Sequence, residues 1–183
     1  MDLFEEKEII EKAKKNPEVF GLLYDKYYQP IFSYVLKRTA NIELTQDLTS
    51  QTFFKALTKL GTFRWQNVPF SSWLYRIAGN EIVNHFRKNK YRVVSLEKIP
   101  TLVSSSNPLT EIIKAENELE KQKDFLSIQE KISKLPFKYQ EVITLRFFEK
   151  KKIKEISQIL GKREGTIKSL LHRGLAKLKT FIT

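Results

Sequence analysis

The sequence predicts an all-α protein with two small helical domains joined by a flexible linker, the C-terminal one containing a helix-turn-helix. Three observations support this fold class. Apolar residues recur at helical spacing in successive segments, and Asn-Pro steps, glycine or proline separate these segments. The 183-residue chain is 41% hydrophobic and 12% aromatic, which is enough for the cores of small folded domains. Residues 91–107 show no sustained period and end in a serine cluster, as linkers do.

The N-terminal half begins with a predicted helix over Asp2–Lys15. Asn16 and Pro17 then provide an N-cap and a proline at the first helical position, which start a second helix. That helix carries a wide apolar face of core residues: Phe20, Leu23, Tyr24, Tyr27, Ile31 and Val35. Pro30 lies inside this pattern, so we expect a kink or a break near Tyr28–Gln29.

Asn41 caps the next predicted helix, which runs to about Leu60. One side of its helical wheel is apolar and holds Phe53, Leu57 and Leu60. Three residues at i, i+4 and i+7 lie well away from that side, namely Asp47, Gln51 and Phe54. A face that combines an acid, an amide and an aromatic ring belongs either to a helix buried on two sides or to a docking surface for another protein.

The segment Gly61–Pro69 breaks the helical period and carries aromatic residues, including Trp65. Aromatic rings in a loop either close over a core or offer stacking platforms for unpaired bases. The helix that follows, from Phe70 to about Lys90, has an apolar face and a mixed face of indole, amide and guanidinium groups. The mixed face consists of Trp73, Arg76, Asn80, Asn84 and Arg87. Such groups contact phosphates and bases together, so this segment is a candidate nucleic-acid surface.

The C-terminal half begins with another capped helix, which Asn107 and Pro108 open and whose exterior is charged. Pro136 stops or restarts this helix, and an apolar helix follows. The apolar helix carries Phe137, Tyr139, Val142, Ile143, Leu145 and Phe147. The basic run Lys150–Lys152 comes next, and it is either a solvated turn or a contact to backbone phosphates.

Two short helices that meet at Gly161 form the last predicted unit, between Ile153 and Leu178. Apolar residues repeat at helical spacing before Gly161, and glycine takes the positive φ that ends a helix. One side of the second helix is apolar and holds Ile167, Leu171, Leu175 and Leu178. The opposite side holds Thr166, Ser169, His172, Arg173 and Ala176, with Lys168 on its flank.

This pattern is typical of a helix-turn-helix, whose second helix enters a DNA major groove. A helical hairpin within an all-α core is the alternative. The outward face favours DNA, because it is rich in Thr, Ser, His and Arg and poor in acids, which suits phosphates and base edges. Glu164 is the exception. Its carboxylate either accepts a hydrogen bond from a cytosine or stabilises the N-terminus of the helix through its negative charge.

The formal net charge of +12 is concentrated in residues 31–90 and 126–183, and weakly acidic segments separate these basic blocks. Two separate basic blocks indicate two polyanion-binding surfaces, although a lysine-rich solvated surface is also common in basic proteins. The acidic N-terminus lacks a signal-peptide core, and no long uncharged apolar run occurs. We therefore expect a cytoplasmic protein without membrane insertion.

The residue types needed for catalysis or metal binding are scarce. The chain has no cysteine, which excludes disulfides, thiolate metal sites and cysteine nucleophiles. His85 and His172 each lie in basic helical sequence, and the sequence contains neither a phosphate-cradling glycine loop nor a serine nucleophile motif. We expect no catalytic residue, no metal site and no cofactor.

The order of these motifs resembles the extracytoplasmic-function (ECF) group of bacterial RNA polymerase sigma factors, which consist of a region 2 domain, a linker and a region 4 domain. The sequence DLTSQTFFKAL at Asp47–Leu57 is similar to the family's polymerase-docking segment. The sequence FRWQNVPFSSWLYRIAGNEIVNHFRK at Phe63–Lys88 is similar to the part that melts and reads the −10 element. Residues Leu135–Lys179 are similar to region 4, which holds the −35 element.

The resemblance implies a region 2 domain over residues 1–90, a linker over residues 91–107 and a region 4 domain over residues 108–183. It implies a transcription initiation factor that binds core RNA polymerase and directs it to promoters by recognising −10 and −35 elements and assisting DNA melting. The expected partners are promoter DNA, an anti-sigma factor and core polymerase, through the clamp of its largest subunit and the region that contacts sigma region 4.

Three sets of site residues follow from the resemblance. The polymerase clamp would be contacted by Asp47, Gln51 and Phe54. The −10 element would be contacted by Trp65, Trp73, Arg76, Asn80, Asn84 and Arg87. The −35 element would be contacted by Arg163, Thr166, Lys168, Ser169, His172 and Arg173. The sequence departs from the family at Lys162, where an apolar residue is usual, and at Arg163, where a small capping residue is expected.

Three other functions share some of these features. A response-regulator output domain or a stand-alone repressor would share the helix-turn-helix, and an RNA-binding helical module would share the basic charge and the loop aromatics. Binding to duplex promoter DNA only in the presence of polymerase would count against both. An anti-sigma or scaffold protein would bind polymerase without depending on DNA-reading side chains such as Arg173.

Overall fold

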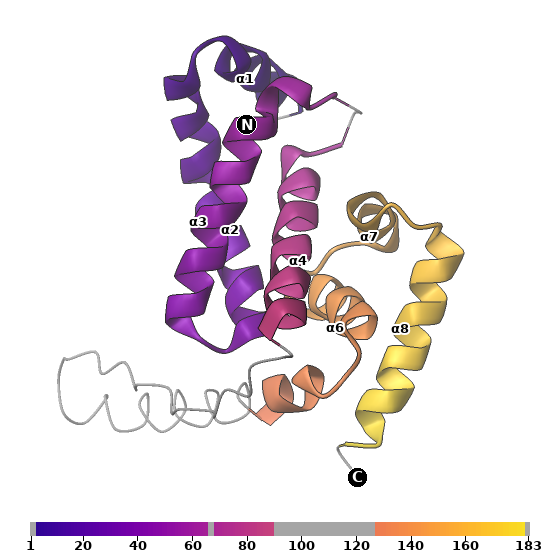
Figure 1. Ribbon diagram of the computed structural model, residues 1–183. Helices are drawn as coiled ribbons and strands as arrows, with labels where there is room; N and C mark the ends of the chain where they lie inside the picture. The colour runs from indigo at the N-terminus through magenta and orange to yellow at the C-terminus, as the bar shows by residue number, and fades with distance from the viewer. Residues whose placement is uncertain (1–2, 66–67, 90–126, 182–183) are drawn as a thin grey trace, which may run out of the picture.

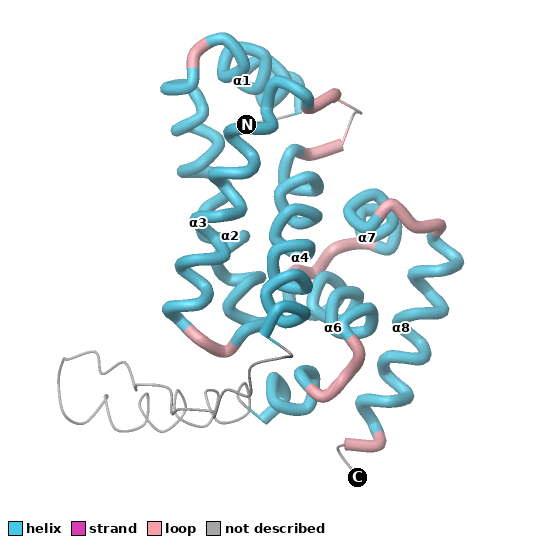
Figure 2. The backbone as a smooth tube through the Cα atoms, in the orientation of Figure 1, coloured by secondary structure: helices cyan, strands magenta, loops and turns pink. Residues whose placement is uncertain are grey.

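The computed structural model describes residues 3–65, 68–89 and 127–181, and these residues form helices and turns without a strand (Figures 1 and 2). The all-α prediction is confirmed. The predicted linker over residues 91–107 and the helix start at Asn107 and Pro108 lie outside the described residues.

Four helices make up the N-terminal half: α1 (Leu3–Lys15), α2 (Phe20–Thr39), α3 (Ile42–Lys59) and α4 (Phe70–Asn89). Helices α2, α3 and α4 pack against one another, and α1 packs on α2 at one end of this bundle (Figure 1). The bundle core is mainly apolar, and Leu23, Ile31, Val35, Leu74 and Ile82 have no exposed surface. Burial of apolar side chains such as these stabilises the bundle.

Asparagine side chains start two of these segments, as predicted. The Asn16 side chain accepts from the backbone N–H of Glu18 at 3.0 Å, and a 3₁₀ turn over Pro17–Val19 then leads into α2. The Asn41 side chain accepts from the N–H of Leu44 at 2.8 Å and caps α3. Each cap satisfies a backbone donor that the helix itself leaves unpaired.

A kink or a break was predicted near Tyr28–Gln29, and the break is wrong. Helix α2 runs from Phe20 to Thr39 with Pro30 inside it. Ile31 and Tyr34, which follow the proline, are fully buried against the bundle. Their packing outweighs the one backbone hydrogen bond that proline removes, and Pro30 itself is exposed, so its ring meets no neighbouring helix.

The C-terminal half contains a helical segment over residues 127–133, then α6 (Phe137–Ile143), α7 (Ile153–Leu160) and α8 (Glu164–Lys179). Helix α6 continues into one π-helical turn over Thr144–Phe148. Helix α8 packs on both α6 and α7, and α7 and α8 meet at Gly161, where φ is +63°. This arrangement confirms the predicted helix-turn-helix.

Helical periodicity overstates the buried face at five positions. Tyr24, Leu57 and Leu175 were placed on packed faces, but their side chains are 39%, 37% and 41% exposed. Phe137 and Phe147, assigned to the apolar helix after Pro136, are also exposed. A wheel gives the direction of a side chain around its helix, whereas burial also requires a neighbouring helix at that height.

The two halves are in contact. Helix α4 packs against α7, and α2 packs against the π-helical turn, so α6 and α7 lie between α4 and α8 (Figure 1). Within the described ranges, each helix is too short or too polar to cross a bilayer. The same ranges contain no group of three or more His, Asp or Glu residues placed to hold a metal ion.

We expect Gly161→Ala to lower the free energy of unfolding by about 1 kcal/mol, because an alanine pays a steric penalty at positive φ. The matched control is Gly165→Ala in the first turn of α8, where a Cβ would meet nothing within 4 Å. This control should be neutral or raise stability by about 0.5 kcal/mol. Urea unfolding followed by circular dichroism measures both, and equal stabilities of the two variants would contradict the prediction.

Candidate nucleic-acid interface

The loop before α4 and the first turn of α4 form an aromatic cluster. The Trp73 ring centroid lies 4.8 Å from that of Phe63 and 5.4 Å from that of Phe70. Phe70 is fully buried, whereas Phe63, Trp65 and Trp73 are half-buried and pack on the core. The loop aromatics therefore close over the core, and their remaining exposed surface faces outward.

A cleft of about 600 Å³ opens beside this cluster. Two of its lining residues, Gln158 and Gly161, come from the helix-turn-helix, and the others come from the loop and the start of α4. The cleft is lined by Thr62, Phe63, Arg64, Val68, Ser72, Trp73, Arg76, Gln158 and Gly161. Ring faces, a hydroxyl and guanidinium groups together suit a flat polar ligand that carries a phosphate.

Arg64 and Ser72 were not among the predicted site residues. Arg64 stands next to Trp65 in the loop, so a guanidinium beside a predicted stacking ring was a signal that could have identified it. Ser72 is buried and lies one residue before Trp73 in α4. Nothing in the sequence marks Ser72, because its place in the cleft depends on how the loop folds back over α4.

Arg76 is joined to the other half of the protein. Its Nε donates to the carbonyl of Ile159 at 2.8 Å, and its Nη2 donates to the carbonyl of Gln158 at 2.6 Å. These carbonyls belong to the last turn of α7, where a helix has unpaired acceptors and a partial negative charge. In this arrangement Arg76 therefore caps the first helix of the helix-turn-helix.

The rest of the mixed face forms a polar stripe along α4. Asn80 and Arg87 are exposed, and Asn84 is half-buried. The Nη2 of Arg87 donates to the Asn84 side-chain oxygen at 3.4 Å, which is a long and weak hydrogen bond. These three side chains remain available to an outside partner.

The predicted polymerase-binding residues lie together on the outer face of α3. Asp47 and Gln51 are exposed, and Phe54 is 67% exposed although its neighbour Phe53 is in the core. The partly exposed Leu57 extends this apolar surface by one turn, which the helical wheel had missed. Phe54 and Leu57 together give α3 an apolar surface beside an acid and an amide, a combination that a protein-docking surface can use.

The outer face of α8 is polar and open. Ile167, Leu170 and Leu171 are buried on its inner side. All six predicted −35 residues are exposed, namely Arg163, Thr166, Lys168, Ser169, His172 and Arg173. Helix α8 begins after Arg163 without a capping side chain, as the sequence indicated.

Partly buried polar contacts join the two halves of the protein. Glu149 accepts from Lys37 Nζ and from the Tyr75 hydroxyl, each at 3.0 Å. Burial, with Glu149 nearby, raises the pKa of Tyr75 above its usual range, so this hydroxyl stays protonated and donates. Glu141 lies 4.0 Å from Arg38. Burial also raises the pKa of Glu141, while the Arg38 guanidinium acts in the opposite direction.

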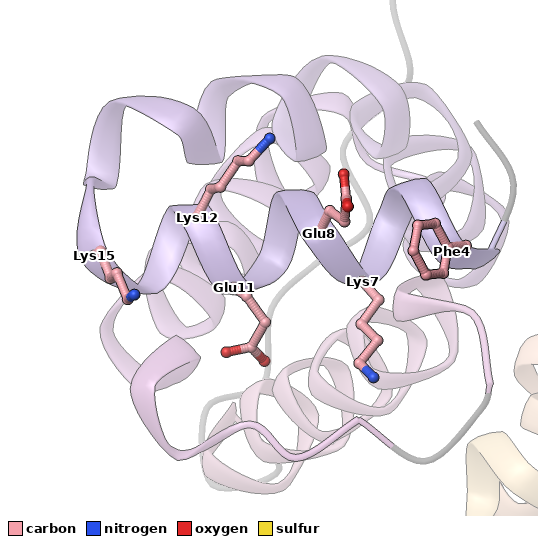
Figure 3. Close-up of a pocket in the computed structure, with 6 residues that line it drawn as sticks. All are labelled: Phe4, Lys7, Glu8, Glu11, Lys12 and Lys15. Atoms are coloured by element: carbon pink, nitrogen blue, oxygen red, sulfur yellow. The ribbon is translucent and has the colours of Figure 1, made fainter.

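A second hollow, of about 390 Å³, follows the outer face of α1 (Figure 3). It is lined by Phe4, Lys7, Glu8, Glu11, Lys12 and Lys15, all from this one helix. Figure 3 shows these side chains spread along the helix instead of converging on a point. This hollow is a shallow groove, and it lacks the convergent polar groups of a binding site.

A helical protein with an open helix-turn-helix and an aromatic cleft beside guanidinium groups is a nucleic-acid-binding protein by its architecture. The chain matches the family model of sigma-70 region 2 over residues 23–92 and that of sigma-70 region 4 over residues 125–178.

Two relatives and one solved structure are similar to most of the chain. RNA polymerase sigma factor YlaC of Bacillus subtilis is 32% identical over 167 residues, which cover 88% of this chain and 90% of YlaC. ECF RNA polymerase sigma factor BldN of Streptomyces coelicolor is 31% identical over 93% of this chain, which spans 63% of BldN. The sigma factor RpoE from Bartonella quintana, solved with the anti-sigma factor NepR, has a TM-score of 0.66 at 20% identity, over 89% of this chain and 96% of RpoE.

The chain therefore belongs to the ECF group of RNA polymerase sigma factors. Sigma factors bind core RNA polymerase and promoter DNA, so the protein is a transcription initiation factor and not an enzyme. This assignment replaces the stand-alone regulator, the RNA-binding module and the scaffold as interpretations of the sequence.

Proposed function

We propose that this sigma factor uses three separate surfaces, with a region 2 domain over residues 1–90, a linker over residues 91–107 and a region 4 domain over residues 108–183. The observation that carries the proposal is the cleft of aromatic rings and guanidinium groups at the start of α4, which lies mainly within the region 2 match. The outer face of α3 docks on the polymerase clamp. The outer face of α8 contacts the −35 element.

The cleft captures a base that leaves the −10 duplex. The base stacks on the exposed part of Trp73, and Trp65 holds the loop against the core. Extruding a base costs a few kcal/mol, and stacking returns roughly 1–3 kcal/mol per base, so a few side chains are enough to bias melting. The strand then continues along the stripe of Asn80, Asn84 and Arg87, while Arg76 contacts it at the edge of the cleft.

Helix α8 enters the −35 major groove with its N-terminal half. Thr166, Ser169, His172 and Arg173 share the open face of this helix, with Lys168 beside them. Lys168 and Arg163 contact phosphates, which fixes the register of the helix but carries no sequence information. Arg173 is long enough and planar enough to donate to the edge of a guanine.

An anti-sigma factor is the proposed regulatory partner. RpoE, which shares the fold, was solved in complex with the anti-sigma factor NepR. The exposed Phe54 and Leu57 give such a partner an apolar surface on α3 that it would share with polymerase. We place the protein in the cytoplasm, where the polymerase acts.

Run-off transcription with purified core polymerase and a library of promoters tests the whole proposal. Specific starts should appear only when the protein is added, and the active templates should share two elements. If no new starts appear anywhere in the library although the protein binds core polymerase tightly, the proposal is refuted.

Asn80→Ala should slow promoter opening more than it weakens recruitment, because Asn80 lies on the strand-facing stripe and outside the helix-turn-helix.

Phe54→Ala should weaken binding to core polymerase by about 2 kcal/mol, or roughly thirtyfold in Kd, since an aromatic anchor commonly dominates an interface. The free energy of unfolding should change by less than about 0.5 kcal/mol, because the ring is mostly exposed. Leu3→Ala, which removes an exposed apolar side chain from α1, is the control and should bind normally. Fluorescence anisotropy measures both affinities, and equal Kd values would refute the docking assignment.

Arg173→Ala should weaken promoter binding by the holoenzyme by about 1–3 kcal/mol and relax the base preference at one −35 position. Lys138→Ala, which removes an exposed cation from α6, serves as the control for lost positive charge. Binding to a library of −35 variants measures the loss for each sequence. A loss that is uniform across the library would instead make Arg173 a phosphate contact.

A further inference from the structure

A buried carboxylate lies behind the cleft, on a helix that the region 2 match does not include. Glu6 belongs to α1, the match begins at residue 23, and the residue is 1% exposed. Its Oε1 accepts from Lys26 Nζ at 3.0 Å and from the Tyr27 hydroxyl. Its Oε2 accepts from the backbone N–H of Phe70 at 2.7 Å. Both carboxylate oxygens are therefore paired, and they join three helices.

The bond to Phe70 determines where α4 begins. Phe70 is the first residue of α4, and its N–H has no partner within the helix. A carboxylate at this position satisfies the N–H and complements the partial positive charge of the helix terminus. The first two turns of α4 carry Ser72, Trp73 and Arg76, which line the cleft.

Helix α1 also holds the other end of the loop. It packs against the 3₁₀ turn Leu60–Thr62, from which the loop departs. The Tyr27 ring, whose hydroxyl is bonded to Glu6, lies 6.1 Å from the Phe70 ring. Both ends of the loop, and the buried Phe70 ring that packs on Phe63 and Trp73, are thus tied to α1.

We propose that Glu6 is a positioning residue for −10 base capture, which sets the geometry of the cleft from outside the family-matched segment. The proposal rests on the function proposed above. Glu6 does not touch DNA. It acts through Phe70 and Tyr27, because any shift of the α4 N-terminus moves Trp73 relative to the loop.

The variant Glu6→Gln keeps the shape of the side chain and changes its hydrogen bonding. Both oxygens of Glu6 face donors, so the amide NH2 of glutamine meets at least one donor in either orientation. The control Glu8→Gln makes the same change on the exposed face of the same helix. Tyr27→Phe removes one donor to Glu6 and supplies a second, milder variant.

The experiment uses holoenzyme assembled from core polymerase and the full chain, on a duplex promoter with 2-aminopurine in the −10 element. For Glu6→Gln we expect unchanged recruitment, opening that is about tenfold slower, and a reduced preference among −10 bases. Tyr27→Phe should show a smaller loss of the same kind, and Glu8→Gln should behave like the unaltered chain.

A purely structural role would lower the melting temperature of Glu6→Gln but leave opening and base preference unchanged well below that temperature, which would overturn the proposal. The proposal would also be overturned if the preference among −10 bases is unchanged both in Tyr27→Phe and in a folded Glu6→Gln. Failure of the unaltered chain to open any promoter would overturn the proposed function and this inference together. Failure of this inference alone is thus distinguished from failure of the proposed function.

Discussion

Helix α4 has two partners along its length, because its apolar side fills the core of region 2 while a second side, which carries Tyr75, Arg76 and Gly79, meets region 4. Leu74, Ala78 and Ile82 have no exposed surface on the first side. Arg76 donates to the end of α7 from the second side. The cleft lies at the N-terminus of this helix, and the asparagine stripe continues from it. Any change in how α4 is held is therefore transmitted to the cleft and to the contact between the two halves.

Two buried charges at the two sides of α4 differ in how well they are paired. The carboxylate of Glu6 has a donor for each oxygen, and a fully satisfied buried network is rigid. The guanidinium of Arg38 donates to Tyr34 from Nη1, whereas its Nε and Nη2 are unpaired among the described residues. The hydrogen bonds of Glu6 therefore hold α1, α2 and α4 together more completely than those of Arg38 hold its own surroundings.

Local signals were the reliable ones in the sequence. Asn16 and Asn41 cap the segments that they were expected to cap, and Gly161 ends α7 in the left-handed conformation. These features depend on hydrogen bonds within a few residues, which sequence spacing specifies directly. A kink or a break was expected near Pro30, and no break occurs, because packing on both sides of the proline keeps the helix continuous. The exposure of Leu57 could not be predicted from the same pattern, since it depends on how far the neighbouring helices extend.

The sequence by itself determined the helices, their caps, the outward faces of α3 and α8, and the family. Each of these features depends on residues that lie within one or two helical turns of one another. The tertiary structure alone decided which side chains meet across the chain. Glu6 reaches Phe70 across 64 positions, and Arg76 reaches Ile159 across 83. Such contacts depend on the packing of whole helices, and no local period encodes the distance between two helices. The cleft and the contact that covers it therefore become visible only in the folded protein.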